Sequence, residues 1–294
     1  MDIMKRPEGA EVEAKAKYDE LLRTHVQRYN FQSLKHLDTL SHEHIFMGDP
    51  AGFNDPFDLR IEISDETGRG PFDNVDNIRK AFKILLDTSP DIANHWFYDD
   101  KLLDAVREWA DGNLPSHHVT SSVSDRLRRF GVACFAPEWD MPLMWSHYGD
   151  SHKGFCVEYL VRPLSLSLTG SFFQIPVTYS SELPSICLSE TLFSPHMVLP
   201  RLLATKHVDW AYEKEWRLVH LEAKGKMTPM CDGLKIGSLI IGRNASHSDR
   251  VRVLAKGREL KVPVYQIKQR FGSYDFYREV TWPVLTLRNS RIQS

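Results

Sequence analysis

The 294-residue sequence contains no long uninterrupted apolar run, which is the main signature of a membrane-spanning helix. Such a helix needs about 20 consecutive apolar residues, and no stretch approaches that length. The first segment, Met1 to Lys17, is rich in charge and lacks the apolar centre of a secretory signal peptide. We therefore expect a cytoplasmic protein.

Cysteine is scarce and net charge is small. The four cysteines, Cys134, Cys156, Cys187 and Cys231, lie far apart and form no C-x-x-C pair. This spacing argues against a cysteine-based metal cluster and against a disulfide framework. The formal net charge is only -2, so the composition does not demand nucleic acid or an anionic membrane as a partner.

The composition is otherwise that of an ordinary globular protein. Hydrophobic residues make up 42% of the chain, and fifteen Phe and seven Trp predict an aromatic-rich core. The length suits one large domain or two modest ones, and neither a repeat nor an interdomain linker is evident.

Hydrophobic periodicity places helices mainly in the first half of the chain and strands mainly in the second. We expect helices at 10–25, 33–40, 74–87, 98–109 and 184–209, the last one interrupted by prolines, and loops at 61–73 and around His117 and His118. We expect strands at 26–31, 44–47, 131–136, 155–160, 174–179, 213–219, 234–241 and 262–267. This layout predicts an α+β protein, with residues 1–27 as a helical extension and residues 28–294 as a single α+β domain.

The stretch from Glu213 to Val219 contains two glutamates two residues apart. In a strand, Glu213, Glu215 and Arg217 share one face. Two carboxylates on one face repel unless a cation or a ligand lies between them. One interpretation is a surface charge ladder in which Arg217 is the partner. The other is a catalytic E-x-E pair, in which one glutamate orients a substrate hydroxyl and the other acts on the nucleophile.

Reactive side chains are most concentrated between Leu143 and Gly154. His147 and His152 are five residues apart, which does not match the i, i+4 spacing of a zinc-binding helix. One interpretation is a helix whose Trp145 and Tyr148 pack on a sheet. The other places Tyr148 or His147 beside the planar ring of a ligand.

A turn is predicted where Asn54, Asp55 and Pro56 follow one another between two phenylalanines. A purely structural turn and a rigid loop lining a ligand cleft are both compatible with this pattern.

These motifs together resemble one bacterial family, catalogued as domain of unknown function 2971. The resemblance rests on Phe53-Asn-Asp-Pro-Phe-Asp58, on Met144-Trp-Ser-His-Tyr148 with His152 and Gly154, and on Glu213-Lys-Glu-Trp-Arg-Leu218. It extends from about residue 28 to about residue 242. The family pattern begins with a Tyr-Lys-Tyr-Arg strand, whereas this chain reads Tyr29-Asn-Phe-Gln32 and lacks the basic residues.

Glu213-x-Glu215 followed by an apolar strand also resembles, more loosely, the ADP-ribosyltransferase superfamily. The resemblance implies an α+β domain with a mostly antiparallel, split or strongly bent sheet flanked by helices. It implies NAD as substrate, Glu215 as the catalytic residue and Glu213 as the acceptor-side residue. The sequence has no G-x-G-x-x-G motif, and that superfamily binds NAD without one.

The same resemblance suggests which residues contact NAD. An aromatic side chain stacks on nicotinamide, an Arg or His stands on an early strand, and Ser146 or Tyr148 could fill the middle-strand position. The early-strand residue could be His25, Arg28 or Tyr29. The full set of expected NAD contacts is Tyr29, Asn54, Asp55, Trp145, His147, Tyr148 and Arg217.

Bacterial proteins with this chemistry often act as toxins or anti-phage effectors on a protein or nucleic acid acceptor. Such a role implies an antitoxin or other neutralising partner, which could dock on the N-terminal helix. The alternative is a non-catalytic module of a defence or toxin-antitoxin system that binds a nucleotide or a protein, with Glu215 paired to Arg217. A third hypothesis is a metal-dependent hydrolase or nuclease that uses His147 and His152.

Overall fold

The computed structural model describes residues 16, 18–59, 62–64, 74–88, 98–162 and 172–282. Most of the helix expected at 10–25 lies outside these residues, apart from a helical turn at 18–22. The proposed boundary between an N-terminal extension and the main domain therefore stays a prediction.

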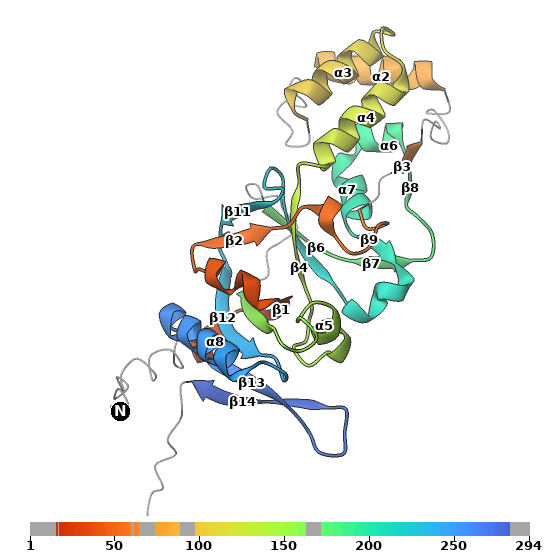
Figure 1. The fold of residues 1–294 in the computed structure, drawn as a ribbon. Coiled ribbons are helices and arrows are strands. Elements are labelled where there is room, and N and C mark those ends of the chain that lie inside the picture. The colour runs from red at the N-terminus through yellow and green to blue at the C-terminus, as the bar shows by residue number, and fades with distance from the viewer. Residues whose placement is uncertain are drawn as a thin grey trace, which may run out of the picture. The chain divides into compact units, whose positions relative to one another are not determined.

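The described chain is α+β, as expected (Figure 1). The strands are β1 Val26–Gln32, β2 His44–Met47, β3 Glu62–Ser64, β4 Gly131–Phe135, β5 Phe155–Val161, β6 Phe172–Pro176, β7 Thr178–Ser180, β8 Ser185–Cys187, β9 Thr205–His207, β10 Trp216–His220, β11 Lys226–Pro229, β12 Leu234–Ile241, β13 Val264–Gln269 and β14 Phe276–Trp282. The α-helices are α2 Val75–Thr88, α3 Asp100–Ala110, α4 Ser116–Leu127, α5 Pro142–His147, α6 Leu188–Phe193, α7 Pro195–Leu203 and α8 His247–Leu260. Short 3-10 helices are η1 Leu34–Thr39, η2 Pro50–Gly52 and η5 Val208–Glu213.

Contacts between residues group the chain into two compact units. Unit 1 contains residues 1–45, 134–165 and 228–294, and unit 2 contains residues 46–133 and 166–227. Neither unit is a continuous stretch of sequence. Strands β2, β4 and β11 carry the chain from one unit to the other.

Unit 1 is built on a five-stranded mixed sheet with the order β1-β5-β12-β13-β14. Its neighbours are antiparallel except β12 and β13, which are parallel. Every residue of β5 is buried, because its nearly continuous apolar sequence suits a central strand covered on both faces. Helix α8 packs against β12 and β13, and the Ser246 side chain caps it by accepting from the Asp249 N–H.

Strands β10 and β6 of the three-stranded sheet β4-β10-β6 belong to unit 2 and are antiparallel, with Arg217 opposite Ile175. Helix α3 packs against both α2 and α4, and Phe82 on α2 and Trp109 on α3 are completely buried. The Asp99 side chain starts α3 by accepting from the Leu102 N–H.

Several boundaries differ from the sequence-based expectation. His117 and His118, expected in a loop, lie in the first turn of α4, because Pro115 ends the preceding loop and begins the helix. The region 184–209 is not one broken helix but β8, α6, α7, β9 and the start of η5. Pro195 stands at the first turn of α7, where a proline starts a helix rather than continuing one.

Further differences concern strands. The region expected as one strand at 174–179 is divided into β6 and β7. Residues 62–64, expected as loop, form β3 and pair in parallel with β8. In the described part of the chain, no helix is long and apolar enough to cross a membrane.

Candidate functional site

Arg217 is the centre of a buried group of charged side chains in unit 2. It lies on β10 and is fully buried. Its Nε donates to Glu215 Oε1 at 2.6 Å, and its Nη1 donates to the Leu203 carbonyl at 2.8 Å. The predicted pairing of Arg217 with Glu215 is therefore confirmed.

Asp58 is the second carboxylate bound by Arg217. Arg217 Nη2 donates to both of its oxygens, at 2.8 and 2.6 Å. The predicted turn delivers Asp58 to this position. Asp55 Oδ1 accepts from the Phe57 N–H at 2.9 Å, and the Asp58 N–H donates to the Asp55 carbonyl at 3.2 Å. This is an Asx turn, so the turn interpretation holds and it also places a charged residue.

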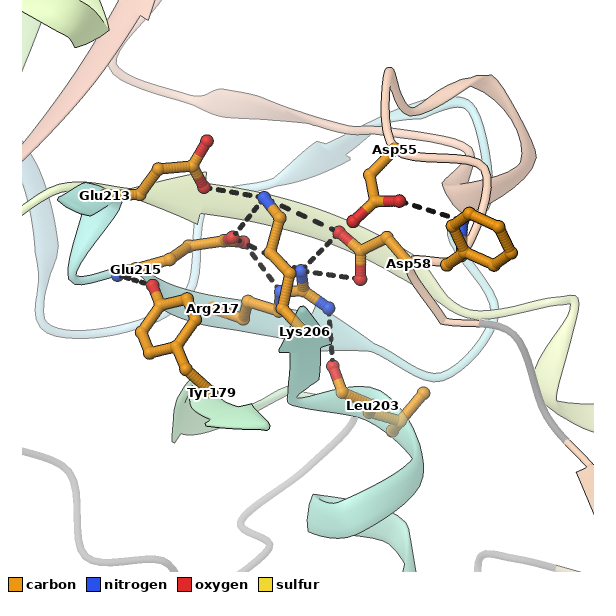
Figure 2. Close-up of polar contacts among 9 residues, drawn as sticks. Asp55, Asp58, Tyr179, Leu203, Lys206, Glu213, Glu215 and Arg217 are labelled. Carbon is orange, nitrogen blue, oxygen red and sulfur yellow. Dashed lines mark hydrogen bonds and ion pairs between the residues drawn. The ribbon is translucent and has the colours of Figure 1, made fainter. Parts of the chain in front are cut away.

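Lys206 joins the two glutamates (Figure 2). Its Nζ donates to Glu213 Oε2 at 2.6 Å and to Glu215 Oε2 at 3.1 Å, and lies 3.8 Å from Asp58 Oδ2. The Trp210 ring, carried by η5, has its centroid 4.8 Å from the same nitrogen. The ammonium is therefore held by three carboxylates and an aromatic face.

We call this group the ionic cluster; its members are Asp58, Lys206, Glu213, Glu215 and Arg217. Their side chains are between 0% and 4% exposed. Three carboxylates face two cations, so the fully ionised cluster carries excess negative charge. The expectation of a solvated surface ladder is wrong, because the counter-charges allow the pair to be buried.

The cluster shifts the pKa values of its members. Burial raises the pKa of Asp58, and the Arg217 guanidinium opposes that shift only in part. Burial lowers the pKa of Lys206, but Glu215 and Glu213 outweigh it and the net shift is upward. Lys206 therefore stays protonated, while Asp58 retains a proton to higher pH than an exposed aspartate does.

The backbone between the two glutamates explains how both reach Lys206. Glu213 ends η5, Lys214 adopts a left-handed conformation with φ 46°, and β10 begins only at Trp216. The expected continuous strand from Glu213 is therefore wrong, because the left-handed residue interrupts it. The Glu215 N–H donates to the Tyr179 hydroxyl at 2.7 Å, and burial raises the pKa of Tyr179 to about 12.

Asn54 and Asp55, expected as NAD contacts, lie in the same unit as the cluster. Asp55 is buried, and its Oδ2 has no hydrogen-bond partner among the described residues. Asn54 is exposed. The turn therefore contributes Asp58 to the cluster, and Asp55, three residues earlier, is buried but is not a member of the cluster.

Trp145, His147 and Tyr148 belong to unit 1, so the described structure does not group them with the glutamates. Trp145 is fully buried, and its Nε1 donates to the Trp139 carbonyl at 2.7 Å. Its ring packs edge-on against Phe31, with centroids 5.1 Å apart. The packing interpretation therefore holds for Trp145, while His147 is exposed and Tyr148 caps α5.

The early-strand candidates also belong to unit 1. The Tyr29 hydroxyl is buried and donates to Glu158 Oε1 at 3.1 Å. Arg28 Nη1 donates to the Gln27 carbonyl at 2.8 Å. His25 Nδ1 lies 2.8 Å from the Thr24 hydroxyl, just before β1. Each of these side chains is engaged within its own unit.

Glu158 is a charged residue that none of the sequence motifs includes. It lies in the middle of β5 with no exposed surface. Both of its oxygens accept from the Tyr18 hydroxyl, and it also accepts from Tyr29 and Ser238. Arg278 Nη1 lies 3.7 Å away. A single glutamate inside an otherwise apolar strand was the available signal.

Lys206, Asp58 and Tyr179 were also passed over. Lys206 falls in a stretch expected to be helical, and Tyr179 ends a stretch expected to be a single strand. Asp58 is part of the predicted turn motif, and its position three residues after Asp55 was a usable signal.

Ser146 and His152 form a pair that the sequence does not reveal. Ser146 Oγ lies 3.2 Å from His152 Nε2, and the His152 ring stacks on Trp145. Burial and, to a lesser degree, Arg243 lower the pKa of His152. His152 Nδ1 is buried with no partner in the described structure, so protonation would bury an unpaired N–H. His152 is therefore a poor general base.

The metal hypothesis receives no support from side-chain clustering. Within the described residues, no group of three or more His, Cys, Asp or Glu side chains could hold a metal ion.

Residues 144–218 match the family model described as Protein of unknown function (DUF2971). The match contains the Trp145 motif, Lys206 and the Glu213–Arg217 stretch, and it supports the expected resemblance over that part of the chain. No curated protein and no solved structure matches the chain.

Proposed function

We propose that the protein transfers ADP-ribose from NAD, with Glu215 as the catalytic carboxylate. The observation that carries this proposal is the charge of the ionic cluster. Three carboxylates face two cations at the E-x-E stretch, and all five side chains are nearly inaccessible to solvent.

Excess negative charge in a dry site suits this reaction. As nicotinamide leaves NAD, positive charge develops on the ribose carbon to which it was bonded. A fixed carboxylate stabilises such a charge far better in a water-poor site than in water. Arg217 and Lys206 fix the Glu215 carboxylate through hydrogen bonds, so little reorganisation is needed when the charge appears.

Glu213 takes the acceptor side in this proposal. It shares Lys206 with Glu215 but belongs to η5, on the other side of the left-handed residue Lys214. The two glutamates are thus held by one ammonium while they approach from different backbone segments. This separation lets one face the ribose and the other face the acceptor.

The proposal requires that the cluster opens to admit NAD, because Glu215 is only 4% exposed. The segment that covers Lys206 is η5, through the ring of Trp210. Displacement of η5 about Lys214 is the opening step that we propose. It carries Glu213 along with η5 and exposes Glu215, while Arg217 stays anchored on β10.

The acceptor in this proposal is a protein or a nucleic acid. A chain with this activity in the cytoplasm fits a toxin or an anti-phage effector, and such a role requires an antitoxin or other neutralising partner.

The test is release of nicotinamide from NAD by the purified protein, with cell lysate as acceptor. Glu215→Gln should lower the rate by about 100-fold or more, because the isosteric amide keeps the shape and loses the charge. Glu182→Gln, at an exposed glutamate of the same unit, is the matched control and should keep full activity. A folded wild-type protein that releases no nicotinamide contradicts the proposal.

One observation favours a second candidate, a non-catalytic nucleotide- or protein-binding module. Glu215 is paired with Arg217, which is the arrangement that this alternative requires. In that case NAD or another nucleotide raises the melting temperature without any release of nicotinamide. Thermal unfolding with NAD, run beside the nicotinamide assay, separates the two candidates.

A further inference from the structure

A cavity of about 310 Å³ lies in unit 1, and its lining includes no residue of the ionic cluster. Its volume is at the lower end of the range of small-ligand sites, which is about 300–1,000 Å³. Its lining comes from the helical turn at 18–22, His42, the turn at 230–233, the N-terminal half of β12, and the segment from the end of α8 to the start of β13. We call it the β12-edge cavity.

The cavity lies where one edge of β12 has no neighbouring strand among the described residues. β12 pairs with β5 from Leu234 to Ile241, but it pairs with β13 only at Leu239–Ile241. The last contact on that side is the Leu239 N–H, which donates to the Pro263 carbonyl at 2.9 Å. Residues 234–237 line the cavity, and within the part of the chain that the structure describes they have a strand neighbour on one side only. Such an edge is a template for another extended backbone.

The lining also contains a set of buried apolar residues. Leu234, Ile236, Leu260 and Val262 are each between 3% and 6% exposed. Apolar lining of this kind favours an aliphatic or aromatic group of a ligand.

Two lysines give the cavity its charge. Lys235 and Lys261 are exposed, and neither forms an ion pair with any residue that the structure describes. Asp232 is the acidic residue of the lining. Lys261 is held in a left-handed conformation with φ 54° as it caps α8. The lining therefore joins an open strand edge, an apolar surface and two available ammonium groups.

We propose that the β12-edge cavity binds the carboxyl-terminal end of an extended peptide. The peptide backbone adds to the open edge of β12, its last side chain contacts the apolar lining, and its terminal carboxylate meets Lys235 and Lys261. At about 3.3 Å per residue, the four open residues of β12 accommodate roughly three to four peptide residues. The ligand is therefore a short peptide terminus rather than a long strand.

The test uses a fluorescein-labelled pool of tetrapeptides with randomised sequences. The pool is made once with a free carboxyl terminus and once as the amide, and fluorescence polarisation is measured with the full chain. The free-acid pool should bind roughly tenfold more tightly than the amide pool, a difference of about 1.4 kcal/mol. Lys235→Gln combined with Lys261→Gln should abolish that difference.

Lys35→Gln, at another exposed lysine of unit 1, is the matched control and should bind like the wild type. Hydrogen exchange provides the second readout, because backbone addition should slow exchange of those amides in residues 235–237 that face the open edge. Equal binding of the two pools, binding by neither pool, or binding without slower exchange at these amides overturns the proposal.

Discussion

At the scale of single residues, unit 2 depends on Arg217, because its removal would leave buried carboxylates without a counter-charge. Arg217 binds both Glu215 and Asp58, and its own side chain is fully buried. Forming a buried ion pair gains little net free energy, because desolvation offsets attraction. Removing one partner is different, since the remaining carboxylates stay buried without compensation.

Arg217→Met should therefore lower the free energy of unfolding by about 3–5 kcal/mol, measured by urea denaturation. Arg201→Met, at a side chain that is 49% exposed, is the control and should change it by less than about 1 kcal/mol. Asp58→Asn should lower the free energy of unfolding less in the Arg217→Met variant than in the wild type, because the buried carboxylate has already lost its partner there. A loss below about 1 kcal/mol for Arg217→Met would show that the guanidinium is not structural.

Asp58 should give the protein a distinct pH dependence. Burial raises its pKa in the folded state above the ordinary value of 3.8, so the folded protein holds this proton more tightly than the unfolded chain does. Asp58 therefore contributes most to stability below pH 3.8, and that contribution falls as pH rises through the folded-state pKa.

The measurement is the difference in unfolding free energy between wild type and Asp58→Asn, obtained at several pH values from 3 upward. As pH rises, the unfolding free energy of the wild type should fall relative to that of Asp58→Asn, because asparagine does not titrate. A shift in favour of the wild type would mean that the Arg217 guanidinium outweighs burial at this carboxyl.

The residues of the cluster were only partly predictable. Strand alternation was enough to pair Glu215 with Arg217, because they are two residues apart. Asp58 lies 159 residues from Arg217, and no local pattern reports a contact over that separation. The position of Lys206 was not predictable for another reason, since it lies in a three-residue strand inside a region of helical composition.

At the scale of elements, segments with a clear hydrophobic pattern were predicted, whereas helices α4 and α8 were not. β5, β12 and α3 have clear patterns and appear close to the expected positions. Helix α8 was missed because its buried face includes Gly257, a weak helix former. The glycine is needed for packing, since a Cβ there would lie 2.1 Å from Val264 Cγ2 on β13.

The turn after α5 has an unusual backbone. Asp150, Ser151 and His152 have successive φ values of 50°, 53° and 66°. A left-handed conformation costs roughly 1–2 kcal/mol per residue for side chains other than glycine. Strain of this kind persists only where the surroundings hold it. Here the Asn244 N–H donates to the His152 carbonyl and the His152 N–H donates to the Trp145 carbonyl.

Ser151→Gly should relieve part of this strain and raise the free energy of unfolding by about 0.5–1 kcal/mol. Ser181→Gly is the control, because Ser181 is equally exposed and is not among the residues with positive φ. That substitution should be neutral or destabilising in the same chemical denaturation experiment. Destabilisation by Ser151→Gly would mean that the serine side chain supports the turn.

At the scale of the whole molecule, the chain forms two compact units from interleaved segments. Unit 1 draws on three segments and unit 2 on two. Composition and periodicity did not reveal this division, because both units mix helices and strands and no linker separates them. The α+β class follows from local patterns, whereas the grouping depends on contacts between distant segments. The expectation of one domain over residues 28–294 stays a prediction.

Interleaving predicts that no single segment folds alone. A fragment of residues 46–133 contains Asp58 and helices α2 to α4 but lacks β6, β10 and Arg217. It should give a poorly dispersed amide spectrum by NMR, with helical content below that expected from α2, α3 and α4. A well-dispersed spectrum would show that the three helices form an independently stable subunit.

The strand order of unit 1 also determines when its strands can pair during synthesis. β1 ends at Gln32, but its partner β5 begins at Phe155, and β5 in turn awaits β12. At about 5–20 residues per second, a ribosome needs roughly 6–25 s to make the intervening stretch. The first strand therefore leaves the ribosome long before it has anything to pair with. Asp58 likewise awaits Arg217, so this carboxyl group has no guanidinium to pair with until residue 217 has been made.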